Sequence, residues 1–251
     1  MIILKSLGEI ELMRKSAKIA AEVLESMGEM AKPGMKTAEL DRYGNSLILK
    51  SGAISAFKDY RGYPAFTCIS VNEEVVHGIP SERKLKEGDI VSIDVGVFKN
   101  GFFGDVAATF PVGQISEEAE VLARVTKDCL AAALEKVNTE NRMGDVSFAV
   151  QSLAEKNGFS VVRVFTGHGI GRSLHEDLQV PNFGKAGTGI RLKDGMTFCI
   201  EPMVNAGVCE VDIGKDGWTV TTKDKKLSAH FEAQVAVVDG HAQVLTDLGS
   251  N

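Results

Sequence analysis

The sequence predicts an α+β fold made of two related halves. Helical patterns alternate with short strand-like runs, and no linker separates them. Residues 85–94, which read Leu-Lys-Glu-Gly and end in Ile-Asp, are echoed at an offset of 107 by residues 192–201, which end in Ile-Glu. His-Gly-Ile also occurs twice, at 77–79 and 168–170. Two echoes in the same order indicate an internal duplication within a single domain spanning 1–251, with halves of roughly 1–112 and 113–251.

Length and composition are those of an ordinary globular domain. The 251 residues are 44% hydrophobic and 25% charged, so a core can form without disulfides. Mean hydropathy is +0.00 and no apolar run approaches the ~18 residues of a membrane span. A net charge of −6 argues against direct nucleic-acid binding. The apolar start at residues 2–4 is too short for a secretory signal, and the four cysteines show no C-x-x-C, so we expect a cytoplasmic protein with reduced thiols.

Capping and stop signals predict four helices, beginning near Ser6, Thr37, Ser116 and Met143. In the first, Ser6 and Glu9 form a capping box, and the apolar pattern stops at residues 32–34. The second is expected to end at residues 51–52, and residues 66–71 are expected to form a strand. Strand-like sequence is expected after each of the last two helices.

The clearest local geometry is a predicted β-hairpin over residues 93–108. Asn100-Gly101 between two alternating runs indicates a type I′ turn, which places Gly96 opposite Asp105. Asp94 then lies diagonally across from Asp105 on the same face, about 7–8 Å away. The opposite face is apolar and forms the core. Two carboxylates thus share one face, beside a glycine where a bulky ligand could sit; a solvated outer face is the alternative reading of this hairpin alone.

Two further acids interrupt apolar runs. Glu201 lies in residues 196–202 and Glu232 in residues 230–238, where an acid is unfavourable unless it is paired or metal-bound. Four such carboxylates repel one another unless a cation is present. With one neutral histidine they carry a charge of −4, which matches two divalent metal ions.

The histidine is expected from residues 166–175, a glycine-rich stretch containing His168 and His175. On one helix these two would be about 10.5 Å apart, so we expect one to be a ligand and the other to face the substrate, with His77 as a second donor. A single histidine of this type is more often structural. The G-x-G-x-G pattern lacks the spacing and the following Lys-Ser/Thr of a phosphate loop, and H-E-x-x-H is absent.

These stretches resemble the type I methionine aminopeptidases, metallopeptidases with the pita-bread fold. The resemblance covers nearly the whole chain and rests on SVNEEVVHGIP, DIVSIDVGVFKNGFFGD, GHGIGRSLHED, FCIEPMVNAG and DGWTVTTKDKKLSAHFE. It implies two pseudo-symmetric halves, with a curved antiparallel sheet covered by helices. It also implies hydrolysis that removes the N-terminal methionine from nascent polypeptides with a small second residue. Only 30 residues separate Glu201 from Glu232, which leaves no space for the helical insertion of type II.

The resemblance also assigns the site. It places the metal ligands at Asp94, Asp105, His168, Glu201 and Glu232, with Asp105 and Glu232 bridging two ions. It gives His77 and His175 substrate contacts that stabilise the tetrahedral intermediate, and it gives Glu201 the relay of a proton. It lines the methionine pocket with Tyr60, Tyr63, Cys68 and Trp218, where aromatic rings and a soft thiol suit a thioether. Manganese, cobalt, iron and zinc all suit such ligands, and the sequence does not choose among them.

The chain departs from the family pattern around the last ligand. Ala233 and Gln234 stand where relatives generally carry His-Thr, His230 replaces a glutamine, and Leu174 replaces an aromatic residue. Partners behind the ligands tune metal affinity and activity by about 10–100-fold, so these positions bear on substrate preference.

Three alternative classes of protein remain open at this point. An Xaa-Pro aminopeptidase or prolidase would share the ligands but usually carries an extra N-terminal domain. A binding protein that has lost catalysis would have lost ligands, and a plain α+β domain would not explain the four acids. We expect a monomer that binds peptide, with possible transient ribosome contact and no membrane partner. We expect no docking extension ahead of the first helix.

Overall fold

The computed structural model describes residues 2–247. Within this range the chain forms four α-helices: α1 (Leu7–Met30), α2 (Thr37–Lys50), α3 (Glu117–Leu134) and α4 (Met143–Lys156). A 3₁₀ turn, Tyr60–Gly62, follows the first strand. None of the helices in this described part combines the length and apolarity needed to cross a membrane.

The strands pair antiparallel in four groups. The first group is β1 (Ile54–Ser55), β4 (Ile90–Lys99) and β2 (Cys68–Val71), with β5 (Phe102–Pro111) also paired to β4. The second runs in the order β15 (His241–Val244), β14 (Ala233–Val238), β9 (Thr197–Ile200), β7 (Thr166–Gly169) and β8 (Glu176–Pro181). The two smaller groups are β13 (Ser228–His230), β10 (Met203–Asn205) and β6 (Ser160–Val161), and β11 (Val211–Ile213), β12 (Val220–Thr222) and β3 (Glu74–Val76).

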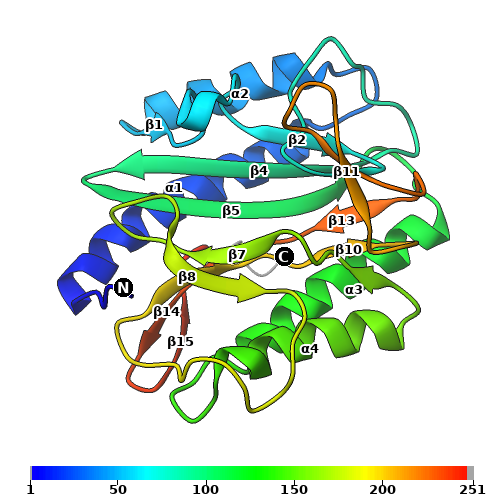
Figure 1. Cartoon of the computed structure of the whole chain (residues 1–251). Helices are drawn as coiled ribbons and strands as arrows, with labels where there is room; N and C mark the ends of the chain where they lie inside the picture. Colours follow the sequence, from blue (N-terminus) through cyan, green and yellow to red (C-terminus); the bar gives the residue numbers. More distant parts are fainter. Residues whose placement is uncertain (1, 248–251) are drawn as a thin grey trace.

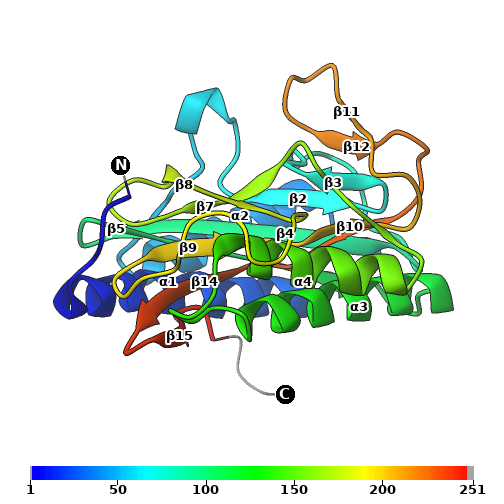
Figure 2. The same cartoon turned by 60° about the horizontal axis from the view of Figure 1, so that its bottom comes forward.

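Helices cover one side of this strand layer. Figure 1 shows β4 and β5 running side by side across the middle of the molecule, with β7 next to them on one side. β9 pairs with β7 and with β14 and extends this part of the layer. In Figure 2, α1, α3 and α4 lie beneath the strands, whereas the 3₁₀ turn and the β11–β12 segment project from the opposite side. The predicted α+β, pita-bread arrangement is confirmed. The projecting segments flank the site described below.

Local sequence explains where the helices begin. Ser6 and Glu9 form the predicted capping box of α1, and Ser116 caps α3. Helix α2 differs from the prediction, because Lys36 rather than Thr37 is its N-cap residue. The Thr37 hydroxyl donates instead to the Ser81 carbonyl, 3.1 Å away. The prediction of a strand after α3 is also wrong: residues 135–142 form turns with two isolated β-bridges, at Asn138 and Arg142, before α4 begins.

The core is continuous beneath both large strand groups. Buried apolar residues of α1, of β4 and β5, and of β9 and β14 belong to one cluster, which includes Leu24, Val95, Val106, Phe198 and Val235. All four cysteines are free and lie within the described residues, as predicted. The core therefore fixes the polar face of the strands from behind.

Candidate metal centre

The β4–β5 hairpin has the predicted register. Gly96 pairs with Asp105 and Val95 with Val106, and the turn residues Asn100 and Gly101 have φ values of 52° and 84°. Positive φ at both positions is what a type I′ turn requires. Asp94 and Asp105 therefore project from one face of the hairpin, with Asp105 buried at 4% exposure.

The glycine between these acids serves a different purpose from the one predicted. A Cβ on Gly96 would lie 2.4 Å from the Phe57 ring, so the missing side chain makes room for that ring. The space beside Gly96, predicted to take a ligand, is thus filled by the chain's own side chain. Phe57 itself lines the cavity, and no local sequence pattern marks it as a site residue.

Glu201 and Glu232 stand at strand ends rather than within strands. Glu201 directly follows β9, and Glu232 lies between β13 and β14. The backbone N–H of Glu232 donates to the Ala107 carbonyl at 2.8 Å, which joins this segment to β5 beside Asp105. The break in each strand turns the acid out of the core and toward the hairpin.

His168 completes the cluster from β7. Its Nε2 lies 3.8 Å from Asp105 Oδ2 and 3.7 Å from Glu201 Oε1. Its Nδ1 lies 3.0 Å from the Gly169 carbonyl, an acceptor that places the proton on Nδ1 and leaves the Nε2 lone pair facing the acids. Burial lowers the pKa of His168 to about 4, so the ring is neutral, which is the form that binds metals.

Cys199 also reaches this cluster. Side-chain ligand atoms of Asp105, His168, Cys199 and Glu232 all lie within 4.8 Å of one another. Cys199 lies in β9 two residues before Glu201, so the alternation of the strand directs both side chains to the same side. This spacing is the sequence signal that marks Cys199 as a neighbour of the acids, beyond its prediction as a reduced thiol.

The carboxylates of the cluster lack a positive partner. Burial raises the pKa of Asp94 from 3.8 to about 7. Burial first, and then the neighbouring acids, raise the pKa values of Asp105, Glu201 and Glu232 as well. Oδ1 of Asp94, Oδ1 of Asp105 and Oε1 of Glu232 are buried without a hydrogen-bond partner. No ion pair among residues 2–247 joins any of the four acids to lysine or arginine, so the missing partners fit divalent cations.

A cavity of about 330 Å³ opens onto these acids. All six predicted substrate-contacting residues line it: Tyr60, Tyr63, Cys68, His77, His175 and Trp218. All five predicted ligands also line it, so the structure brings the whole predicted set together: Asp94, Asp105, His168, Glu201 and Glu232. Sequence reasoning missed several wall residues, among them Phe57, Arg61, Val164 and Phe165.

Two histidines stand at the cavity beside the acids. The His175 ring lies with its centroid 4.1 Å from that of His168, and its Nδ1 is 2.8 Å from Tyr60 Oη. His77 packs edge-on against Trp218, with centroids 6.4 Å apart. Partial burial lowers the pKa of His175 and of His77, which favours neutral rings that can donate one hydrogen bond each.

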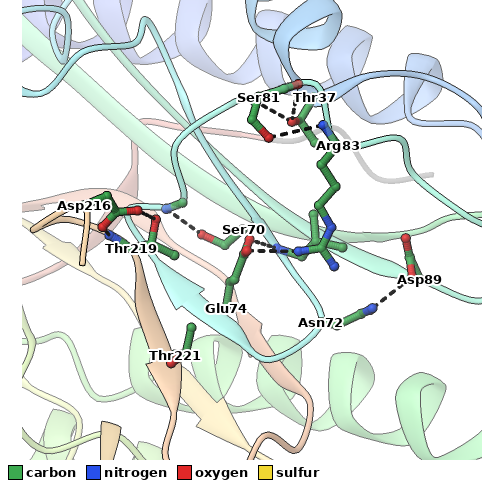
Figure 3. Close-up of polar contacts among 12 residues, drawn as sticks. Thr37, Ser70, Asn72, Glu74, Ser81, Arg83, Asp89, Asp216, Thr219 and Thr221 are labelled. Atoms are coloured by element: carbon green, nitrogen blue, oxygen red, sulfur yellow. Dashed lines mark hydrogen bonds and ion pairs between the residues drawn. The ribbon is translucent and has the colours of Figure 1, made fainter. Parts of the chain in front are cut away.

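The segment that carries His77 is held by a polar network (Figure 3). Ser70 Oγ accepts from the Gly78 backbone N–H at 3.1 Å. Glu74 accepts from Arg83 at 2.9 Å and Asn72 donates to Asp89 at 2.9 Å, which fixes the turn between β2 and β3. His77 itself has a φ of 59°, an uncommon conformation that this network maintains.

The departures from the family pattern lie around the acids, partly behind them and partly in the cavity wall. Gln234 Oε1 accepts from the Asp105 backbone N–H at 3.2 Å, and Gln234 Nε2 donates to the Phe103 carbonyl at 3.4 Å. His230 is buried and its Nε2 has no partner. Ala233 is buried in β14, and Leu174 lines the cavity. Gln234 therefore supports the Asp105 backbone.

Comparison with known proteins identifies the family of this chain. The model of metallopeptidase family M24 matches residues 11–239, and the chain belongs to this family. Methionine aminopeptidases are among its relatives. That of Clostridium perfringens is 53% identical over 98% of this chain and 99% of its own length. That of Escherichia coli K12 is 48% identical over 98% of this chain and 94% of its own.

Solved structures show the same fold. Methionine aminopeptidase from Rickettsia prowazekii superposes with a TM-score of 0.97 at 41% identity, covering 98% of this chain and all of that one. Prolidase from Pyrococcus furiosus has a TM-score of 0.81 at 22% identity, and the matched region is 66% of that chain. The prolidase likeness concerns the fold alone.

Proposed function

We propose that the protein removes the N-terminal methionine from polypeptides in a metal-dependent reaction. The observation that carries this proposal is the cluster of four buried carboxylates and a neutral histidine on the floor of a cavity. Relatives named methionine aminopeptidase over nearly the full chain support it. The spacing of Glu201 and Glu232 favours the type I group.

Asp94, Asp105, His168, Glu201 and Glu232 would hold two divalent ions. Asp94, Asp105 and Glu232 each offer a buried oxygen without a hydrogen-bond partner, and His168 and Glu201 would complete the ligand set. Two bound ions supply positive charge that activates water and polarises the scissile carbonyl. Manganese, cobalt, iron and zinc all suit these ligands.

Three residues of the chain would handle protons and charge. Glu201, whose pKa is raised by burial, can take a proton from the attacking water and pass it to the leaving amine. His175 and His77 can donate to the oxyanion and to the peptide backbone from the cavity wall. Tyr60 Oη faces His175 Nδ1, which leaves Nε2 of His175 for the substrate.

The pocket side of the cavity fits an unbranched thioether. Tyr63 and Cys68 are buried, and the Tyr63 ring meets Trp218 edge-on with centroids 5.2 Å apart. Leu174 adds an apolar wall where relatives carry an aromatic residue. Sulfur–aromatic contacts favour methionine over a branched side chain of similar volume.

The finer assignments follow from the family resemblance. We propose nascent chains with a small second residue as substrates, a cytoplasmic location, a monomeric state and transient contact with the ribosome. The net charge of −6 disfavours direct binding of nucleic acid.

The test is methionine release from a Met-Ala-Ser peptide by stripped protein reconstituted with manganese or cobalt. Leu-Ala-Ser and Leu-Pro peptides serve as controls for the pocket and for prolidase-type activity. Metal-dependent release confined to the methionine peptide is expected. Cleavage of Leu-Pro alone would replace the proposal with a prolidase, and binding of metal without any cleavage would favour a protein that has lost catalysis.

A further inference from the structure

The segment ahead of helix α1 is tied to the loop that carries His175. Lys5 and Glu176 form an ion pair across 171 positions of sequence, and their side chains are only 2% and 11% exposed. The Lys5 ammonium also donates to the Ile3 carbonyl at 3.0 Å, and its backbone N–H donates to the Gly195 carbonyl at 2.7 Å. Burying two charges is unfavourable unless they stay paired with each other. A buried ion pair like this one therefore holds both side chains in one geometry.

Glu176 in turn holds the turn between β7 and β8 closed. Its Oε1 accepts from the Arg172 backbone N–H at 3.1 Å, and the Gly171 N–H donates to the Ser173 carbonyl at 3.1 Å. A Cβ on Gly171 would lie 2.4 Å from Lys5 Cε, so the lysine side chain fills the inside of this turn. The turn is thus built around the ion pair.

His175 depends on this turn for its position. Its ring reaches over the acids, with its centroid 4.1 Å from that of His168, and its hydrogen-bond partner is Tyr60 from the projecting segment. Its backbone is fixed on one side by Leu174, which is buried in the cavity wall, and on the other by Glu176. Lys5 does not line the cavity, so any effect on the reaction passes through Glu176 and His175.

We propose that Lys5 is a positioning residue of the aminopeptidase: through Glu176 it holds His175 where the substrate carbonyl meets it. This inference rests on the proposed function, because it assigns Lys5 a part in the same reaction. A second ion pair joins these segments, between Arg172 and Glu9 at 3.2 Å. Its side chains are 63% and 31% exposed, so solvent screens the interaction.

The first experiment compares Lys5→Met with wild type in the release of methionine from Met-Ala-Ser. We expect kcat to fall about 10–100-fold, as for partners behind a site, with KM changed less and bound metal unchanged by elemental analysis. Lys5→Met/Glu176→Gln should recover part of the loss, because no charge is then left buried alone. The control is Lys18→Met in helix α1, which should match wild type. Lys18 pairs with Glu22 at 3.8 Å, and these side chains are 74% and 59% exposed.

The second experiment repeats Lys5→Met in a His175→Ala background, where it should change kcat less than about twofold if Lys5 acts through His175. An equal loss in both backgrounds, or a lower Tm with wild-type kcat, would overturn the proposal. Amide exchange across residues 171–176 should rise in Lys5→Met; unchanged exchange would also overturn it. If wild type releases no methionine, the proposed function fails, and faster exchange in Lys5→Met would then support the structural tie alone.

Discussion

Two strand pairs supply the four carboxylates, and they differ in how far apart their acids lie in the sequence. In the first, Asp94 and Asp105 sit on one hairpin, β4–β5, in contiguous pairing. In the second, Glu201 and Glu232 lie at the ends of β9 and β14, which also pair antiparallel, but β10 to β13 come between them in the sequence. A local turn brings the first two acids together, whereas the second two are brought together by pairing between strands that are distant in the sequence.

The two pairs nevertheless begin in the same way. The Gly88 N–H donates to the Val112 carbonyl at 3.0 Å and the Val112 N–H to the Asp89 carbonyl at 2.9 Å. In the second pair, the Gly195 N–H donates to the Val237 carbonyl and the Val237 N–H donates to the Met196 carbonyl, each at 2.9 Å. The predicted duplication remains a prediction, and superposing residues 40–112 on 145–238 without common topology would contradict it. The same two hydrogen bonds thus occur in both strand pairs, although the two acids are close in sequence in the first pair and far apart in the second.

The largest effect is expected from a substitution in the first strand pair, the β4–β5 hairpin. Asp105→Asn should remain folded and lose about 10³-fold or more in kcat/KM, because the proposed metal site would lose a ligand and with it several kcal/mol of transition-state stabilisation. Metal content should fall below that of wild type in elemental analysis. The matched control is Asp212→Asn, an exposed acid of β11. Full activity of Asp105→Asn would refute a dimetal site.

The corresponding substitution in the second strand pair is Glu201→Gln. We expect kcat to fall about 10²-fold because the proton relay is removed. Circular dichroism should match wild type, and at least one metal ion should remain bound, since Asp94, Asp105 and Glu232 are intact. An unchanged kcat would exclude Glu201 as the group that moves the proton.

Substitutions at two glycines test how tightly the chain packs beside each strand pair. A Cβ at Gly167, beside His168, would lie 2.3 Å from the Cys199 carbonyl, whereas at Gly96 it would meet the Phe57 ring at 2.4 Å. Backbone cannot yield as a side chain can, so Gly167→Ala should destabilise by about 3 kcal/mol and Gly96→Ala by about 1 kcal/mol. Thermal melts should therefore show the larger Tm loss for Gly167→Ala. The reverse order would mean that β9 is the more adaptable strand.

The smallest effect is a pH dependence of the metal-free protein. The Asp94 pKa is raised from 3.8 to about 7, so the folded chain keeps a proton that the unfolded chain releases between these values. This contribution to stability is lost as pH rises through the window. The lowered pKa values of the buried histidines act in the opposite direction, so the comparison is with Asp94→Asn, in which the histidines are unchanged. Between pH 5 and 8 the Tm of the metal-free wild type should fall relative to that of Asp94→Asn by a few degrees, about 2–4 °C per kcal/mol. A Tm difference that does not change with pH would contradict the raised pKa of Asp94.

The hairpin could be predicted because its geometry is local. Asn100-Gly101 fixes the turn, and the turn fixes the partner of Asp105. Glu201 and Glu232 were identifiable as acids in apolar runs, but their places at strand ends depend on the Glu232 bond to Ala107, which no local pattern encodes.

Contacts between distant segments explain what was missed. Phe57 fills the space beside Gly96, Cys199 reaches the ligand cluster, and Lys5 reaches Glu176, and each contact joins residues far apart in the chain. The cap of α2 was misplaced because Thr37 bonds to Ser81 instead of to its own helix. The metal identity is not encoded in the ligand types, since several ions share these preferences.

The most direct test of the central claim is a manganese titration of the stripped protein, with bound metal and methionine release from Met-Ala-Ser measured in the same samples. The dimetal account predicts that up to two ions bind per chain and that release appears only as they bind. Release by the metal-free protein, or two ions bound without release, would contradict it.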